Sequence, residues 1–110
     1  MEHEMILAIV ERGKADRTVE AAKAAGAKGG TIFLARGTGQ HEAKTFFGLT
    51  LETGREIVLI VTERTATDAI LRAVIESARL DEPGTGIAFV VPVSRIVGLD
   101  HRERLRREGS

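Results

Sequence analysis

The stretch PGTGIAFVVPV, residues 83–93, places two glycines immediately before an almost unbroken apolar run. Residues 87–91 of that run include β-branched and aromatic side chains and are typical of a buried strand. Gly84 and Gly86 flank Thr85, and a Gly-x-Gly turn lets backbone N–H groups approach an anion without interference from a Cβ atom. The same glycines also suit a tight turn between a helix and a strand. The stretch therefore predicts a strand preceded by a turn that is either purely structural or able to bind a phosphate.

Apolar runs and helix-forming segments alternate along the rest of the chain. Runs rich in isoleucine and valine indicate buried strands, whereas alanine-rich segments dotted with charges favour helices. Strands are expected at residues 4–11, 31–35, 56–62 and 87–91, with a short one within 44–51, and helices at 14–25 and 65–80. This order fits an α+β, ferredoxin-like βαββαβ sandwich, in which both helices lie on one face of an antiparallel sheet.

The expected strands are apolar on both faces, because MILAIV, IVLIV and IAFVV hardly alternate between apolar and polar residues. Two helices cover only one face of such a sheet, which leaves the other face exposed. We expect that second face to meet further copies of the chain in a cyclic oligomer.

Length and composition indicate one globular domain. The 110 residues are 43% hydrophobic and 29% charged, which suits one modest core. We expect a domain at residues 1–99 and a charged, flexible tail at 100–110. The 16 basic residues balance 16 acidic ones, so net charge gives no reason to expect nucleic acid as a partner. The absence of cysteine and of a long apolar segment fits a cytoplasmic protein.

No pattern of residues indicates catalysis. The sequence contains no recognisable Ser-His-acid group or pair of carboxylates, and the absence of cysteine removes thiol catalysis. His3, His41 and His101 are scattered and lack neighbours at metal-ligand spacing. We therefore expect neither enzymatic activity nor a metal site within one subunit.

Two glycine motifs together resemble the PII signal-transduction superfamily. Residues 26–39, GAKGGTIFLARGTG, resemble its second strand and the start of its T-loop, and residues 84–93, GTGIAFVVPV, resemble its B-loop and last strand. The resemblance covers residues 5–99. It implies a homotrimer that binds ATP, ADP or AMP in clefts between subunits and signals by moving the T-loop. Bicarbonate and Mg²⁺ are candidate second ligands, and no permanently bound cofactor is expected.

The resemblance also assigns roles to individual residues. Nucleotide phosphates would lie on the turn formed by Gly84, Thr85 and Gly86, and a valine at Gly86 is expected to weaken binding but leave the trimer intact. The further nucleotide-binding candidates are Arg36 and Arg95 as positive groups, Gly37, Thr38, Gly39 and Gln40 in the T-loop, and Ile9, Thr31 and Phe89 around the base. Each also has a structural explanation: the three strand residues would fill the core, and Arg36 would be a solvated charge.

Several positions depart from the nitrogen-regulatory members of the superfamily. Ile87 stands where the superfamily has a lysine after the B-loop, and the T-loop lysine has no clear counterpart, Gly54 and Arg55 being nearest. The chain has no tyrosine for uridylylation, and only about sixteen residues separate Gly39 from Glu56. These departures indicate a short-T-loop PII-like protein of the kind encoded beside membrane transporters or carboxysome genes. A membrane transporter or a carboxysome-associated protein is the expected partner.

Two other functions fit the same pattern. A ligand-free structural or interaction module would show the same strands, and Ile87 favours it. A metal-responsive trimer related to the copper-tolerance proteins would share the fold. The tail offers a further candidate contact for an anion or an acidic partner through Arg102, Arg104, Arg106 and Arg107.

Overall fold

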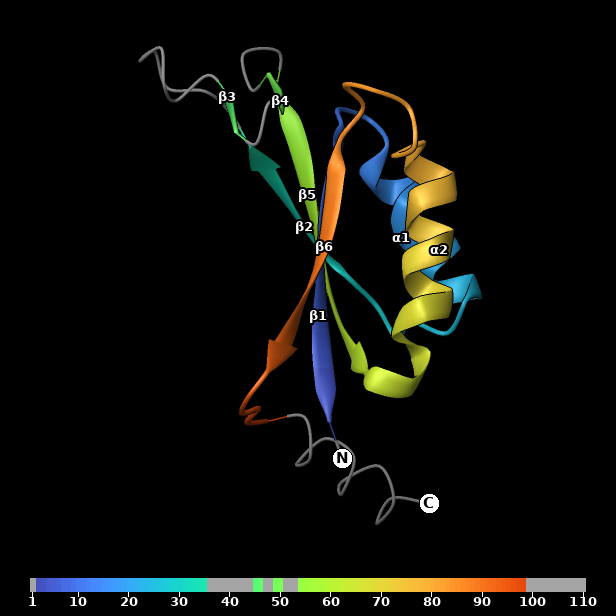
Figure 1. Ribbon diagram of the computed structural model, residues 1–110, viewed down its shortest axis with the longest axis vertical. Helices are drawn as coiled ribbons and strands as arrows, with labels where there is room; N and C mark the ends of the chain where they lie inside the picture. The colour runs from blue at the N-terminus through green and yellow to red at the C-terminus, as the bar shows by residue number, and fades with distance from the viewer. Residues whose placement is uncertain (1, 36–44, 47–48, 51–53, 99–110) are drawn as a thin grey trace.

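The elements of the protein follow the predicted order (Figure 1). The computed structural model describes residues 2–35, 45–46, 49–50 and 54–98. In chain order the elements are β1 (His3–Glu11), α1 (Ala15–Ala24), β2 (Thr31–Ala35), β3 (Thr45–Phe46), β4 (Leu49–Thr50), β5 (Arg55–Glu63), the 3₁₀ helix η2 (Arg64–Ala66), α2 (Thr67–Ala78) and β6 (Ile87–Val93). The short strand expected within 44–51 is a small antiparallel hairpin of β3 and β4.

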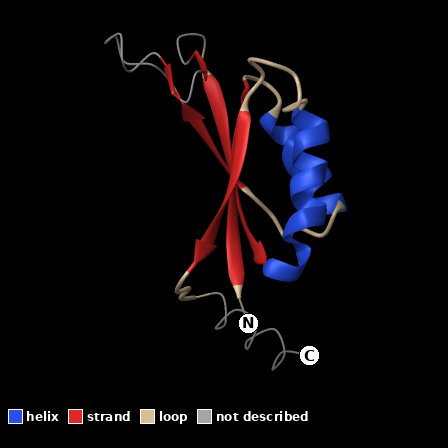
Figure 2. Cartoon of the chain, in the orientation of Figure 1, coloured by secondary structure: helices blue, strands red, loops and turns tan. Residues whose placement is uncertain are grey.

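The four long strands form one antiparallel sheet in the order β2-β5-β1-β6, so β2 and β6 are its edges. Both helices lie on one face of this sheet, as Figure 2 shows. The register places Leu7 of β1 opposite Leu59 of β5 and Phe89 of β6. This arrangement confirms the α+β, ferredoxin-like fold.

The core lies between the sheet and the two helices. Because side chains alternate along a strand, Ile6, Ala8 and Val10 of β1 share one face, and all three are fully buried. The residues packed with them include Val58 and Ile60 of β5, Val19 and Ala22 of α1, and Ile70, Val74 and Ala78 of α2. Burying one Val or Ile side chain contributes roughly 1.5–3 kcal/mol, so this cluster holds both helices on the sheet.

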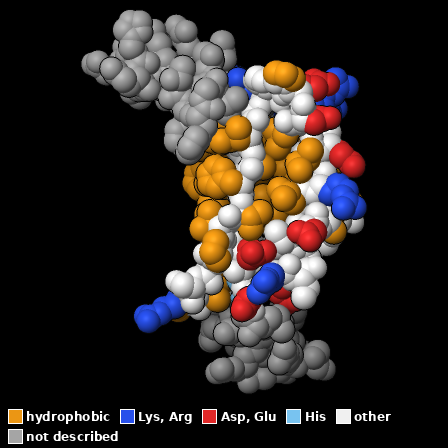
Figure 3. All heavy atoms as spheres, viewed as in Figure 1, with side chains coloured by type: hydrophobic (Ala, Val, Ile, Leu, Met, Phe, Trp, Pro, Cys, Tyr) orange, Lys and Arg blue, Asp and Glu red, His pale blue; other side chains and the backbone are white. Residues whose placement is uncertain are grey.

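The opposite face of the sheet, which we call the open face, is apolar and has no helix over it in the described part of the chain. Cross-strand pairing sets one row of side chains across all four strands: Phe33, Ile57, Ile9 and Ile87. Phe33 is 48% exposed, and Val61 and Val91 on the same face are also exposed. In Figure 3 hydrophobic side chains gather in the middle of the view, on both sides of the sheet edge, whereas most charged side chains lie over the helices and toward the two ends.

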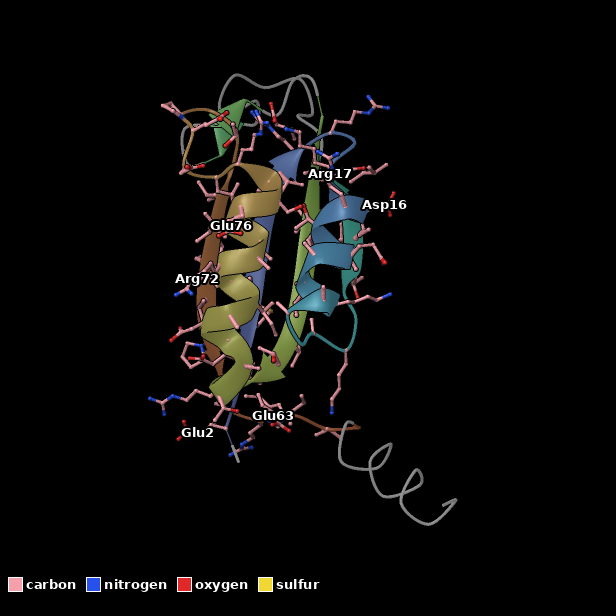
Figure 4. The ribbon with its side chains drawn as sticks, turned by 90° about the vertical axis from the view of Figure 1, so that its right-hand side faces the viewer. Glu2, Asp16, Arg17, Glu63, Arg72 and Glu76 are labelled. Carbon is pink, nitrogen blue, oxygen red and sulfur yellow. The ribbon has the colours of Figure 1, made fainter. Side chains whose placement is uncertain are left out.

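The outer sides of the helices are polar. Figure 4 shows Asp16 and Arg17 on α1 and Arg72 and Glu76 on α2, and all four side chains are exposed. The helices therefore turn their charged side to water, and the open face is the one large apolar surface that the described elements leave uncovered. Neither described helix is long and apolar enough to cross a membrane.

Candidate functional site

Four strand ends meet at one end of the sheet, at the top of Figure 1, which we call the loop end. β1 ends there at Glu11 and β2 at Ala35, while β5 begins at Arg55 and β6 at Ile87. Pairing sets Ala35 and Glu11 on either side of Arg55, and Ile87 opposite Ile9. The antiparallel topology thus gathers the β1–α1 turn, the β2–β5 connection and the turn before β6 at one place.

The turn at residues 84–86 is attached to the end of α2. Arg79 follows that helix in a left-handed conformation with φ 57°, and its carbonyl oxygen accepts the N–H of Glu82 at 3.0 Å. The Thr85 side chain is buried, with its hydroxyl 2.7 Å from the Arg79 carbonyl oxygen and 2.9 Å from that of Glu82. The N–H of Thr85 also donates to the carbonyl oxygen of Glu82 at 3.4 Å, so both the side chain and the N–H of Thr85 are engaged inside the protein.

The two glycines of the turn serve different needs. Gly84 is exposed with φ +80°, where glycine avoids strain, and a Cβ there would meet no atom within 4 Å. A Cβ on Gly86 would overlap the carbonyl oxygen of Ile9 and lie 2.9 Å from Cδ2 of Leu80. Gly86 therefore permits β6 to pack closely on β1. A valine at Gly86 is therefore expected to disturb the sheet itself, in addition to any effect on ligand binding.

Arg55 holds the turn from two strands away. It is the first residue of β5 and is only 9% exposed. Its guanidinium reaches past β1, where Nη1 donates to the carbonyl oxygen of Thr85 at 2.7 Å and Nη2 to that of Gly84 at 3.1 Å. Hydrogen bonds from a charged donor are roughly twice as strong as neutral ones. The turn before β6 is thereby anchored to the residue at which the β2–β5 connection rejoins the sheet.

Glu56, the next residue, holds the other turn at the loop end. Its Oε1 accepts the backbone N–H of Gly13 at 2.9 Å and that of Ala15 at 3.0 Å. A carboxylate in this position satisfies the first N–H of α1 and one N–H of the turn that precedes it, and it suits the positive end of the helix dipole. Because neighbouring strand residues point to opposite faces, Arg55 and Glu56 anchor two different turns from the same strand end.

A surface ion pair completes the electrostatics of this end. Nζ of Lys14 lies 3.0 Å from Oε1 of Glu11. The hydrogen bond from Lys14, followed by its positive charge, holds the pKa of the Glu11 carboxyl below its ordinary value. Glu11 therefore stays ionised to lower pH than a free glutamate, and much of the charge of Lys14 is balanced locally.

The predicted nucleotide-binding residues are spread over both edges and both ends of the sheet. Ile9, which is 1% exposed, lies at the loop end. Phe89 lies further along β6, and Thr31 is exposed at the start of β2 on the opposite edge. Arg95 comes after β6 at the far end of the sheet from the turn. Arg36, and the residues 37–40 that follow it, lie outside the described residues, as does the tail at 100–110.

Strand geometry shows how widely these residues are separated. At about 3.3 Å per residue, the seven residues of β6 carry the chain roughly 20 Å away from the turn before Arg95 is reached. At about 4.8 Å per strand, the edge carrying Thr31 lies roughly 14 Å from the edge carrying the turn. Within one subunit, the structure brings Ile9 to the turn but not Thr31 or Arg95.

The anchoring residues Arg55 and Glu56 were not among the predicted site residues. Their only sequence signal is a pair of charges directly after Gly54 and directly before the apolar run IVLIV. A charge at that position is ordinarily a solvated strand end, and only the pairing of β5 with β1 shows what it reaches. For metals, residues 2–35, 45–46, 49–50 and 54–98 contain no group of three or more His, Asp or Glu side chains that could hold an ion.

Fold and site together define a class: a ferredoxin-like α+β protein with a glycine turn beside the connection between its second and third long strands. The chain belongs to the family of nitrogen regulatory protein P-II, whose model matches residues 3–103. It is also similar to the crystal structure of Arabidopsis thaliana PII bound to citrate, at 26% identity and a TM-score of 0.68 over 90% of this chain and 84% of that chain. A search of curated proteins gave no match. The resemblance to PII proteins is thus confirmed at the level of the family.

Proposed function

We propose that this chain is a homotrimeric, adenine-nucleotide-responsive regulator, and not an enzyme. The observation that carries the proposal is the anchored glycine turn: Gly84 is open to solvent, while the carbonyl oxygens of Gly84 and Thr85 are held on the inner side by Arg55. Backbone N–H groups of a Gly-x-Gly turn suit the oxygens of a phosphate. ADP, AMP or ATP would place its phosphates there.

The distribution of the other candidates supports a site between subunits. The turn and Thr31 lie on opposite edges of the sheet, and Arg95 lies at the opposite end. A nucleotide on the turn would meet a threonine of β2 or an arginine after β6 only from a neighbouring copy. The apolar open face gives such copies a surface on which to associate, since an exposed apolar face of this kind is stabilised when a second copy covers it.

The β2–β5 connection is the proposed output of the regulator. It enters the loop end at Ala35 and leaves it at Arg55, so both of its attachment points lie at the end of the sheet that carries the turn. Ligand binding would change the affinity for a partner only if the partner distinguishes two states of this connection. We assign the chain to the short-T-loop, PII-like type, with a membrane transporter or a carboxysome-associated protein as partner in the cytoplasm, and with bicarbonate or Mg²⁺ as second ligand.

Isothermal titration calorimetry with ATP, ADP, AMP and cyclic AMP tests the proposal directly. At least one nucleotide should bind with micromolar affinity or better, and the absence of heat with all four would refute nucleotide sensing. Citrate, the ligand named for the plant structure, should be titrated in parallel, because carboxylate binding without nucleotide binding would point to a different ligand class.

A matched pair of variants at Gly84 tests whether phosphates lie on the turn. Asn and Asp both tolerate a left-handed backbone and have nearly the same shape, and a side chain at Gly84 has open space around it. Gly84→Asp should weaken the binding of the preferred nucleotide at least tenfold relative to Gly84→Asn, because only the aspartate repels a phosphate. Equal affinities for the two variants would show that the phosphates bind elsewhere.

A further inference from the structure

The hydrogen bonds of Arg55 determine the orientation of two peptide groups. The carbonyl of Gly84 belongs to the peptide group that also carries the N–H of Thr85, and the carbonyl of Thr85 belongs to the one that carries the N–H of Gly86. No peptide bond in the described part of the chain is cis, and in a trans peptide the N–H points away from the C=O. Holding both carbonyl oxygens on the guanidinium therefore turns the N–H groups of Thr85 and Gly86 away from Arg55.

The other hydrogen bonds at the turn do not set this direction alone. The N–H of Thr85 lies 3.4 Å from the carbonyl oxygen of Glu82, which is a long bond, and the Thr85 hydroxyl is bonded on the α2 side. Gly84 itself is free to rotate, because glycine populates both signs of φ and a Cβ there would touch nothing. The fork of Arg55, with bonds of 2.7 and 3.1 Å, engages both peptide groups at once, and hydrogen bonds from a charged donor are stronger than neutral ones.

We propose that Arg55 is a positioning residue that aims the N–H of Gly86 at an anionic ligand, holds the Thr85 peptide group against Glu82, and links the orientation of the 84–86 turn to the start of β5. The ligand-binding part of this inference rests on the function proposed above. Arg55 does not itself touch the ligand; it acts through the backbone of the turn. Because Arg55 is the residue at which the β2–β5 connection rejoins the sheet, a displacement of that strand end would rotate the turn and lower its affinity for the anion, and by linkage the bound anion would hold the strand end in place.

Neighbouring residue Glu56 supplies the matched control. It lies one position further along β5 and is also a charged anchor, but its partners are Gly13 and Ala15 on the β1–α1 turn. Glu56→Gln should therefore disturb the amides of that turn and leave the 84–86 turn in place. Arg55→Met removes the fork but keeps an unbranched side chain of similar reach, and Arg55→Lys keeps the charge but cannot hold two carbonyl groups in a fixed geometry.

The first measurement uses the ligand-free protein. In ¹H–¹⁵N correlation spectra, Arg55→Met should shift or broaden the amide signals of Thr85 and Gly86 and speed the hydrogen exchange of the Thr85 amide, which is bonded to Glu82, at least tenfold, with a smaller effect for Arg55→Lys. The amides of Gly13 and Ala15 should respond to Glu56→Gln instead. Unchanged Thr85 and Gly86 amides in either folded Arg55 variant would overturn the proposal. If Arg55→Met does not fold, the amide signals of Thr85 and Gly86 in Arg55→Lys provide the same test.

The second measurement separates positioning from general destabilisation. Arg55→Met and Arg55→Lys should weaken ADP binding at least tenfold and threefold, respectively, while the affinity for adenosine, which has no phosphate, should stay within twofold. An equal loss for both ligands would mean that Arg55 only supports the fold and would overturn the proposal. Failure of the unchanged protein to bind ATP, ADP, AMP or cyclic AMP would refute the nucleotide function, whereas the ligand-free amide measurement would still decide whether Arg55 orients the turn.

Discussion

Replacing Gly86 by alanine should destabilise the protein much more than the same replacement at Gly84. The two glycines are two residues apart in one turn, yet a Cβ on Gly86 would overlap the carbonyl oxygen of Ile9, whereas a Cβ on Gly84 would meet nothing within 4 Å. Leu80 Cδ2, at 2.9 Å from the added Cβ, can move because it is the end of a flexible side chain. The Ile9 carbonyl cannot, because it belongs to a strand in the interior of the sheet.

The magnitude follows from opposing contributions. Forcing extra volume into a packed site costs about 1–3 kcal/mol and occasionally more, whereas Gly→Ala gains about 0.4–1 kcal/mol by restricting the unfolded chain. Because the obstacle at Gly86 is backbone, we expect the upper part of that range and a net loss of about 2 kcal/mol in the free energy of unfolding. At Gly84 the left-handed backbone costs about 1–2 kcal/mol, which leaves a net loss of about 1 kcal/mol or less after the same gain.

Urea denaturation measures the loss of unfolding free energy in both variants. The protein concentration is kept the same throughout, because the stability of an oligomer depends on it. For a domain of this size, an extra loss of about 1 kcal/mol in Gly86→Ala should lower its Tm by roughly 4–8 °C relative to Gly84→Ala. Cross-strand NOEs between Ile9 and Ile87 should weaken only in the Gly86 variant, since only there must β6 move from β1. Equal stabilities, or a less stable Gly84 variant, would refute the packing role of Gly86.

Three further outcomes follow from other contacts. Glu56→Gln keeps an acceptor oxygen but removes the negative charge at the N-terminus of α1, so it should cost about 0.3–1 kcal/mol of unfolding free energy; urea denaturation with no change would contradict this. Lys14 lowers the pKa of Glu11 in the folded protein. The ion pair therefore stabilises the fold at pH values above the pKa of the unfolded carboxyl, and this stabilisation is lost as the pH falls through the lowered pKa of the folded state. The stability difference from Glu11→Gln should therefore be a few tenths of a kcal/mol at neutral pH, vanish in acid and shrink in high salt, and a difference that grows in acid would contradict it. Phe33→Lys on the open face should reduce the mass measured by light scattering, whereas Val97→Lys, at a residue 97% exposed, should not; an unchanged Phe33→Lys oligomer would place the subunit interface elsewhere.

The helices and long strands could be predicted because each depends on a pattern of residues within one short stretch of sequence. The run IVLIV can hardly be anything but a buried strand, and the alanine-rich α1 segment has strong helix propensity and a glycine, Gly26, beyond its end. The apolar second face was predictable for the same reason, since the strands do not alternate. The glycine turn was found by its motif, but the difference between Gly84 and Gly86 was not, because a motif does not show which glycine faces a neighbouring strand.

The anchors at the start of β5 could not be predicted, because their partners are distant in sequence. Arg55 lies about thirty positions from the carbonyl groups it holds, and Glu56 about forty from the amides it accepts. Only the strand order, which sets β5 beside β1 and β1 beside β6, brings these groups together. The topology likewise places Thr31, Arg95 and the turn at different edges and ends of the sheet.

A buried arginine at the start of β5 is unfavourable if only the free energy of folding is considered. Ile57, Leu59 and Val61 follow Arg55 on the same face of the strand, so an apolar side chain at position 55 would extend that row without the loss of hydration that a buried charge suffers. Such a side chain would leave the carbonyl groups of Gly84 and Thr85 without their donor, and the turn would lose its orientation. The desolvation of Arg55 is opposed by its hydrogen bonds to these two carbonyl groups, which hold the turn in one orientation. If the proposed anion binds at the turn, this one charge connects the fold to the ligand more directly than the glycines, which a purely structural turn would also require.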